Sequence, residues 1–325
     1  MENSESTSPT PFTVGQFFEQ AKDRLKIELV AGEGGLSKTL GETAINRPGL
    51  ALAGFFDYFP VHRMQVIGLA EYTYLTTLTA KERAARFELL FKTHAPAILF
   101  TRGKKLFPEL PKLAERYNVP LLRTSMVTRN FINAATIIME DIAAPRCRIH
   151  ATMMEVVGLG VILEGPAGIG KSETALGLIR HGHALVADDL TELKRDPTER
   201  LIASAVAVTR HYMEIRGLGI IYVPAHFGAA SVRDAKQVDL VVTLRMMSDG
   251  EFDRSGSGDL HREFLGVSVP QVIIPVAPGR DLVNVVETVA QEYRLRFKGE
   301  FAQRELDKKI MLHHAAMAAE KETRK

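Results

Sequence analysis

A glycine-rich segment near the middle of the chain limits most strongly what the chain can fold into. Residues 165–172 read Gly-Pro-Ala-Gly-Ile-Gly-Lys-Ser, which matches the phosphate-loop pattern G-x-x-x-x-G-K-[ST]. The apolar run at 160–163 predicts a buried strand directly before the segment, and the pattern from Lys171 to Arg180 predicts a helix directly after it. Gly182 is placed to end that helix. A strand, a glycine loop and a helix N-terminus in this order predict a cradle for phosphate groups.

Each residue type in the loop has a physical role in binding a nucleotide. The glycines let backbone N–H groups approach the phosphates, and the helix dipole favours the negative charge. The lysine would reach the outer phosphates, and the serine hydroxyl would ligate Mg²⁺. The pattern by itself also allows a plain glycine turn between a strand and a helix. The candidate phosphate-binding residues are Gly165, Pro166, Ala167, Gly168, Ile169, Gly170, Lys171 and Ser172.

The composition is that of a globular protein and narrows the classes of partner. The 325 residues suggest two domains, and the net charge of +2 does not favour nucleic acid as the main partner. No apolar run reaches the roughly 18 residues of a membrane helix, and the polar N-terminus has no apolar signal core. The single cysteine, Cys147, rules out an intramolecular disulfide. We therefore expect a cytoplasmic protein with no membrane or nucleic-acid partner.

The pattern along the chain predicts two α/β domains after a short tail. We expect residues 1–10 to be disordered, 11–143 to form a small N-terminal α/β domain, and 144–325 to form the catalytic domain with C-terminal helices. Apolar strands alternating with helices of 10 to 15 residues predict a small parallel sheet in the first domain. The expected strands there are 64–67, 97–100 and 119–122, and the expected helices are 12–21, 81–92, 108–117 and 127–143.

Two neighbouring carboxylates follow the loop helix. The expected strand 184–187 ends in Asp188 and Asp189, where a carboxylate would lie near the phosphates. Because the alternation of side chains breaks down at a strand end, one aspartate could hold metal while the other faces an incoming hydroxyl group. A solvated strand end or a helix N-cap is the plainer alternative.

Three further segments carry charged residues next to glycine. Glu214 and Arg216 alternate with apolar residues, which predicts one shared strand face, and Gly217 and Gly219 would permit close backbone approach. Arg254, in a glycine- and serine-rich loop, could close over phosphates or stay in solvent. A strand at 272–276 leads into Gly279-Arg280 and an N-cap at Asp281, which suggests a second anion site. Further helices are expected after Asp281 and over about 301–320.

Together these segments resemble the HPr kinase/phosphorylase family. The resemblance rests on His150, the phosphate loop, Glu173-Thr174-Ala175, the strand end 186–189, the segments 214–221 and 275–280, and it covers about 147–298. The Glu-Ile-Arg-Gly-Leu-Gly run beginning at Glu214 is the family's signature. The resemblance implies a phosphate-loop core similar to that of phosphoenolpyruvate carboxykinase, assembled as a homohexamer.

The resemblance also implies an activity, its cofactors and its partners. A seryl hydroxyl group of HPr, the small phosphocarrier protein of the sugar phosphotransferase system, would be phosphorylated by ATP, or by pyrophosphate in its place. Mg²⁺ or another divalent cation would assist. In the reverse reaction, inorganic phosphate would remove the phosphoryl group and give pyrophosphate.

The resemblance implies a role only for those residues of this chain that match the family's motifs. Asp189 matches the proton acceptor, Lys171 and Ser172 match the loop lysine and metal-ligating serine, and Glu214 matches a second metal ligand. His150 and Arg254 match further active-site residues. The segment tied to dephosphorylation matches Pro275, Val276, Ala277, Pro278, Gly279 and Arg280, although many members carry arginine where this chain has Ala277.

Two other functions are open to a chain with this loop. One is a different phosphate-loop enzyme, such as a small-molecule kinase. The other is a nucleotide-sensing regulator with little turnover. A proton acceptor at Asp189 beside Lys171 favours catalysis, because nucleotide binding alone does not need one.

Overall fold

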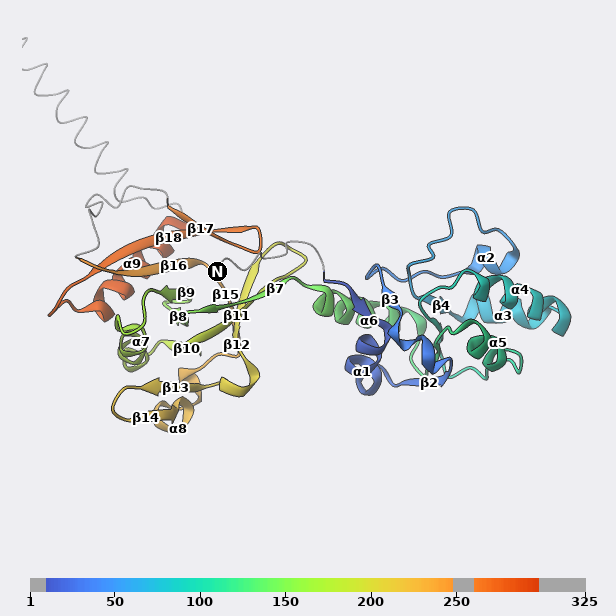
Figure 1. Cartoon of the computed structure of the whole chain (residues 1–325), viewed down its shortest axis with the longest axis horizontal. Helices are drawn as coiled ribbons and strands as arrows, with labels where there is room; N and C mark the ends of the chain where they lie inside the picture. Colours follow the sequence, from blue (N-terminus) through green and yellow to red (C-terminus); the bar gives the residue numbers. More distant parts are fainter. Residues whose placement is uncertain (1–9, 248–259, 298–325) are drawn as a thin grey trace, which may run out of the picture. The chain divides into compact units, whose positions relative to one another are not determined.

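The computed structural model describes residues 10–247 and 260–297 and divides into two compact units, one ending at Pro145 and the other beginning its main part at Arg146 (Figure 1). Arg254, the helix expected at about 301–320 and the expected disorder of residues 1–9 lie outside the described residues. Both units mix helices and strands, as the sequence predicts. No helix within the described ranges is long and apolar enough to span a membrane.

The first unit is built on a four-stranded sheet in the order β2-β6-β5-β4. Three of its strands are parallel and arise from the predicted apolar runs, while β2 pairs antiparallel at the edge beside β6. The sequence patterns did not indicate β2, an edge strand in which only Ile27 is fully buried. The strands span β2 Ile27–Ala31, β4 Gln65–Ile67, β5 Ile98–Phe100 and β6 Leu121–Thr124.

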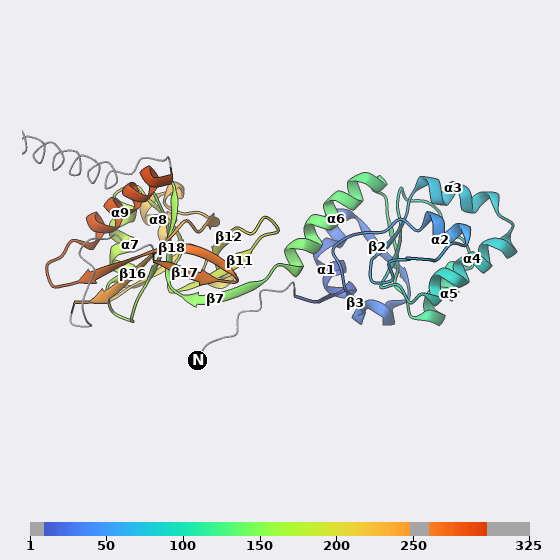
Figure 2. The same cartoon turned by 90° about the horizontal axis from the view of Figure 1, so that it is seen from above.

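Helices cover both faces of this sheet (Figure 2). α1 and α6 share one buried apolar cluster with it, and α4 and α5 share another. α1 begins two residues later than predicted because Thr13 caps it, accepting a hydrogen bond from the backbone N–H of Gln16. The helices are α1 Val14–Leu25, α2 Gly49–Ala53, α3 Leu69–Thr77, α4 Ala80–Lys92, α5 Leu110–Tyr117 and α6 Thr128–Ala143; β1 Phe12–Thr13 pairs with β3 Thr39–Leu40.

The second unit contains a six-stranded sheet in the order β10-β8-β9-β16-β18-β17. β9, β16 and β18 are parallel to one another. β8 runs antiparallel to both β9 and β10, so β9 and β10 point the same way. The strands span β8 Thr152–Val156, β9 Leu159–Glu164, β10 Ala184–Ala187, β16 Leu240–Met246, β17 His261–Phe264 and β18 Val267–Val276.

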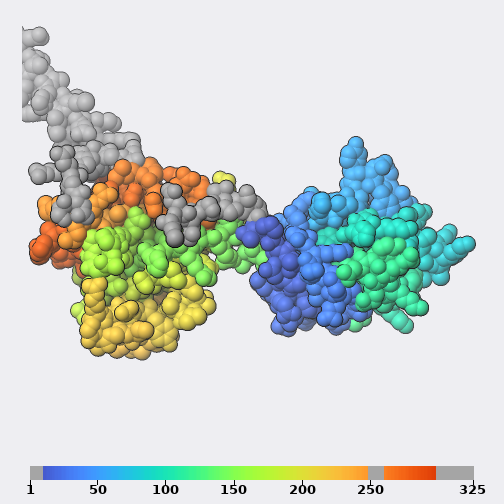
Figure 3. Space-filling view, viewed as in Figure 1, coloured from blue at the N-terminus to red at the C-terminus, as the bar shows by residue number. Residues whose placement is uncertain are grey.

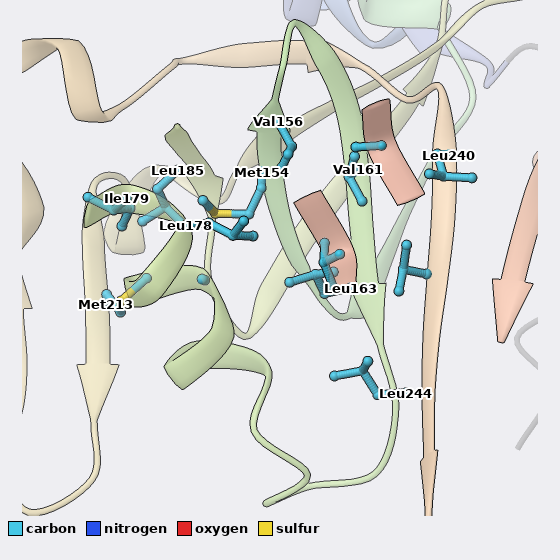
Figure 4. Close-up of a cluster of buried hydrophobic side chains, with 14 of the residues drawn as sticks. Met154, Val156, Val161, Leu163, Leu178, Ile179, Leu185, Met213, Leu240 and Leu244 are labelled. Carbon is cyan, nitrogen blue, oxygen red and sulfur yellow. The ribbon is translucent and has the colours of Figure 1, made fainter. Parts of the chain in front are cut away.

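The two faces of this sheet are covered differently. Helices α7 (Lys171–Arg180) and α9 (Leu282–Phe297) pack on one face, α7 against β8 and β10 and α9 against β9 and β16. Leu178 of α7 lies beside Met154 of β8 in the buried cluster on this face (Figure 4). A second, four-stranded sheet shares the buried cluster on the other face. Its order is β15-β12-β11-β7, with β7 Arg146–His150, β11 Leu190–Arg195, β12 Leu201–Ala205 and β15 Ala235–Gln237.

The segment expected as one strand around Glu214 is a hairpin instead. β13 (Tyr212–Ile215) pairs antiparallel with β14 (Gly219–Tyr222), and Arg216 lies in the turn between them. Gly217 and Gly219 have φ angles of 78° and 92°, and no atom lies within 4 Å of a Cβ built on either residue. No atom of the described chain makes a close approach there, and glycine suits the left-handed backbone of the turn. The short helix α8 (Val223–Phe227) follows.

Candidate active site

The strand order brings the phosphate loop and the paired aspartates to one edge of the six-stranded sheet. The loop follows the carboxyl end of β9, and Asp188 follows the carboxyl end of β10. Because β9 and β10 point the same way, these two ends lie at the same edge, separated only by β8. The first residue of β8, Thr152, lies at this edge between them and pairs with Leu163.

The loop has the backbone of a phosphate cradle. Gly165, Gly168 and Gly170 have φ angles of 149°, 84° and 105°, which side chains rarely tolerate. Gly170 is the N-cap of α7, so the first N–H groups of that helix face the loop. The Nζ atom of Lys171 donates to the carbonyl oxygens of Gly165 at 3.0 Å and Pro166 at 3.2 Å. The lysine is thereby folded back over the cradle, where it can meet an anion.

Asp188 is the buried centre of the site, with only 6% of its surface exposed. Its Oδ1 atom accepts hydrogen bonds from the hydroxyl groups of Thr152 (2.9 Å) and Ser172 (3.1 Å), and Oδ2 accepts one from the backbone N–H of Glu214 (3.3 Å). Burial raises the pKa of Asp188 above the ordinary value, and these hydrogen bonds oppose the rise in part. Asp188 therefore connects the phosphate loop, β8 and the β13–β14 hairpin.

Asp189 differs from its neighbour because the chain turns at this residue. Its φ angle is 61°, and the backbone N–H of Leu190 donates to the carbonyl oxygen of Asp188 at 2.7 Å. The chain thereby leaves β10 and enters β11 in the other sheet, and the Asp189 side chain stays exposed. His150, the last residue of β7, pairs with Leu190 and so lies next to this turn. Because the alternation of strand side chains breaks at this turn, the Asp188 side chain is buried and the Asp189 side chain is exposed.

A cavity of about 280 Å³ collects most of the predicted residues. His150, Lys171, Ser172, Asp189 and Glu214 all line it, together with much of the phosphate loop. The remaining residues of its wall, to which the sequence assigned no single role, are Thr152, Glu173, Asp188 and Arg216. The Asp188-Asp189 pair and the Glu214–Arg216 spacing were visible signals, but Thr152 could be found only from the order of the strands.

Not every predicted residue lies on the cavity wall. Ile169 of the loop is buried in the apolar core beside α7, with 7% of its surface exposed. The segment 275–280 reaches the same edge of the sheet, since β18 is parallel to β16 and β9, but it does not line the cavity. The Arg280 guanidinium group donates to the carbonyl oxygen of Pro275 at 2.9 Å. Leu282, just beyond this segment, lies 3.8 Å from a Cβ built on Gly170.

The donors around the cavity fit a magnesium ion held partly by phosphate. Four carboxylates, from Glu173, Asp188, Asp189 and Glu214, face only two permanent cations, from Lys171 and Arg216. Oxygen donors and excess negative charge suit Mg²⁺, which proteins commonly hold with one or two carboxylates plus substrate phosphates. The described residues contain no group of three His, Cys, Asp or Glu side chains placed to hold a metal ion alone.

Family models match both units of the chain. A family model described as HPr Serine kinase C-terminal domain matches residues 141–310, and one described as HPr Serine kinase N terminus matches residues 12–139. The HPr kinase/phosphorylase of Leptospira biflexa serovar Patoc (strain Patoc 1 / Ames) is 40% identical over 307 residues, which are 93% of this chain and 95% of that protein.

Other relatives carry the same name. The HPr kinase/phosphorylase of Exiguobacterium sp. (strain ATCC BAA-1283 / AT1b) is 39% identical over 291 residues, covering 88% of this chain and 94% of that protein. A solved structure of the Hpr(Ser) kinase/phosphatase from Coxiella burnetii is 35% identical, covers 49% of this chain and 98% of that one, and has a TM-score of 0.45. The matches to both family models and the identity over nearly the whole chain show that this protein belongs to the HPr kinase/phosphorylase family.

Proposed function

We propose that this enzyme transfers the γ-phosphoryl group of ATP to a seryl hydroxyl group of HPr, and that it also removes that group with inorganic phosphate to give pyrophosphate. The observation that carries the proposal is the cavity in which a phosphate loop, two aspartates and Glu214 converge. A nucleotide-binding regulator would need the loop but not the exposed carboxylate of Asp189 beside it. The family relationship supports HPr as the protein substrate.

In the forward direction the loop and its lysine would position the nucleotide. The N–H groups at the start of α7 would donate to the β- and γ-phosphates, and Lys171 would exchange its two carbonyl acceptors for phosphate oxygens. Ser172, Glu214 and Asp188 are the residues that would hold Mg²⁺, which when bound neutralises charge on the phosphates. Arg216 lies over the loop, since its guanidinium nitrogen is 3.0 Å from a Cβ built on Gly168, and it would contact the transferred group.

Asp189 is the group that would accept the proton of the attacking serine. It is exposed and lines the cavity, whereas Asp188 is buried and occupied by three donors. In the reverse direction, microscopic reversibility makes protonated Asp189 the donor to the departing seryl oxygen. Inorganic phosphate would attack from the position of the nucleotide's β-phosphate. His150 lines the same cavity and would orient Asp189 or contact phosphate.

The proposal includes the cellular setting that the family resemblance implies. The enzyme would act as a cytoplasmic homohexamer, and Arg254 and the segment 275–280 would assist the phosphate chemistry. Gly279-Arg280 precedes α9 at the edge of the sheet that carries the phosphate loop, which supports a role in binding phosphate.

The decisive experiment is incubation with HPr and ATP labelled in the γ-phosphate, followed by mapping of the labelled residue. We expect label on a single serine of HPr. Addition of unlabelled inorganic phosphate should then release labelled pyrophosphate. ATP binding without label on HPr would instead identify the chain as a regulator, and label on a small molecule would identify another class of kinase.

A further inference from the structure

The β13–β14 hairpin has one face in the core and an opposite face that is unusually apolar for a surface. The pairing places Met213 and Ile221 on the inner face, where they are 1% and 8% exposed. It places Tyr212 opposite Tyr222 and Glu214 opposite Ile220 on the outer face. A surface hairpin normally alternates apolar residues inside with polar residues outside. Here three of the four outer positions are apolar or aromatic.

The apolar outer face is well exposed and extends beyond the two strands. Ile220 is 73% exposed, and the rings of Tyr212 and Tyr222 lie 5.2 Å apart between centroids. Leu218, in the turn between the strands, is 69% exposed. No atom of the described chain lies within 4 Å of a Cβ built on Gly217 or Gly219. We call the set formed by Tyr212, Leu218, Ile220 and Tyr222 the hairpin patch.

The hairpin patch is continuous with the wall of the candidate active site. Glu214 lies on the same outer face as Ile220 and lines the cavity, and Arg216 of the turn lines it as well. The backbone N–H of Glu214 is fixed by its hydrogen bond to Asp188. Figure 3 shows this part of the chain, in yellow, forming the surface at the lower edge of the second unit. An apolar surface therefore begins where the charged cavity ends.

We infer that the hairpin patch docks the protein substrate, through an apolar surface next to the serine that is phosphorylated. This inference rests on the proposed function. The cavity is lined almost entirely by charged residues, hydroxyl groups and glycine, so it can recognise phosphate and a hydroxyl group but offers little to distinguish one protein from another. Apolar and aromatic side chains beside a reaction site are the usual source of affinity for a folded partner.

A second copy of this chain is the main competing occupant, and the position of the patch argues against it. A copy seated on Leu218 and Ile220 would lie against Glu214 and Arg216 and would obstruct the mouth of the cavity. The acceptor serine arrives on a folded protein, which needs that mouth open.

The test compares two double variants of the full-length enzyme. Leu218→Ser with Ile220→Ser removes two exposed side chains of the patch, and Leu50→Ser with Ile137→Ser removes two side chains of similar exposure, 70% and 60%, from the first unit. For the patch variant we expect the KM for HPr, and the Kd for fluorescently labelled HPr, to rise about tenfold or more. The kcat at saturating HPr and the Kd for ATP should stay unchanged. The control variant should match wild type in the KM for HPr, the Kd for HPr, the kcat and the Kd for ATP.

Three outcomes for the patch variant would overturn the inference. Unchanged KM and Kd for HPr in a folded patch variant would show that HPr docks elsewhere. A loss of assembly size by sedimentation velocity would show that the patch joins copies of this chain, and a fall in kcat alone would give the hairpin a role in chemistry. Wild-type enzyme that binds HPr without labelling it would defeat the proposed function alone, because the Kd comparison still tests docking. Wild-type enzyme that neither binds HPr nor labels it would contradict both the proposed function and the docking inference.

Discussion

At the residue scale, Asp188 and Asp189 are adjacent in sequence and yet occupy opposite environments. Asp188 is buried and accepts three hydrogen bonds, while Asp189 is exposed at a left-handed turn. Burial raises the pKa of Asp188, as expected for a carboxylate removed from solvent. Paired groups whose surroundings differ in this way commonly divide metal binding and proton transfer between them. We assign the proton to Asp189 because only its side chain is open to an incoming hydroxyl group.

Asp189→Asn should therefore abolish both directions of the reaction while leaving the fold intact. Asparagine tolerates the φ angle of 61° as well as aspartate does, so the turn should survive. Loss of a positioned general acid and base typically lowers the rate by about 10² to 10⁴. The measurements are ATP-dependent labelling of HPr and pyrophosphate release from phosphoseryl-HPr.

Glu199→Gln is the matched control for that variant. Glu199 is also an acidic residue at a left-handed position, with φ of 63°, but it lies in the turn between β11 and β12 and does not line the cavity. Removing its charge should change neither rate. If Asp189→Asn retained either activity near the wild-type level, one carboxyl group could not serve both directions.

At the element scale, the turn between β11 and β12 allows a test of pH dependence. Partial burial opposes ionisation of Asp196, but hydrogen bonds from the backbone N–H groups and side chains of Arg200 and Thr198 lower its pKa to about 2. A carboxylate whose pKa is lowered on folding stabilises the protein above its unfolded pKa of about 4. That stabilisation is lost as the pH falls from about 4 towards 2.

Asp196→Asn should lower the free energy of unfolding by about 1 kcal/mol at pH 7, because it loses the charged bond to Arg200 while solvent screening keeps the effect small. Urea denaturation at pH 7 and pH 3 would measure it. We expect the difference between variant and wild type to shrink at pH 3. A difference that grew on acidification would show that the turn is held by something other than the ionised carboxylate.

The segment 275–280 supports a second prediction at this scale, on the direction of the reaction. Arg280→Ala removes a cation at the edge that carries the phosphate loop, but it leaves the cavity wall untouched. We expect pyrophosphate release from phosphoseryl-HPr to fall more than labelling of HPr, because only the former requires bound inorganic phosphate. Arg294→Ala, later in α9, is the control. Equal loss of both activities would show that the segment supports the structure and does not favour either direction of the reaction.

At the scale of the whole molecule, each of the two units has its own buried core. The clusters in the first unit draw on residues 12–143, and those in the second draw on residues 147–293. Every catalytic or metal-binding residue predicted within the described part of the chain, from His150 to Glu214, belongs to the second unit. The predicted boundary near residue 144 remains a prediction about independent folding, and a truncation can test it.

A fragment beginning near Pro145 should retain kinase and phosphorylase activity in vitro. It keeps the whole cavity wall and both sheets that pack around the site. Its activities would be compared with those of the full chain at equal concentration, after its assembly size has been matched by sedimentation. A folded and correctly assembled fragment with neither activity would show that the first unit completes the active site.

The sequence by itself determined the local elements of the site. The loop pattern, the helix Lys171–Arg180 and the strand Ala184–Ala187 follow from glycine spacing and short-range apolar periodicity, and the structure has them at the predicted bounds. These features depend on interactions between near neighbours in the chain. The family signature around Glu214 likewise indicated the right segment, although it was expected as one strand and is a hairpin.

Only the tertiary structure decided which of these elements meet. The order β10-β8-β9 places Thr152 between the phosphate loop and Asp188, and the change of sheet at Asp189 buries one aspartate while exposing the other. The hairpin patch was hidden in the sequence because its apolar residues read as ordinary strand core. The order of the strands, the burial of each side chain and the face of the sheet on which it lies depend on contacts between residues far apart in the chain. Local sequence patterns do not encode those contacts.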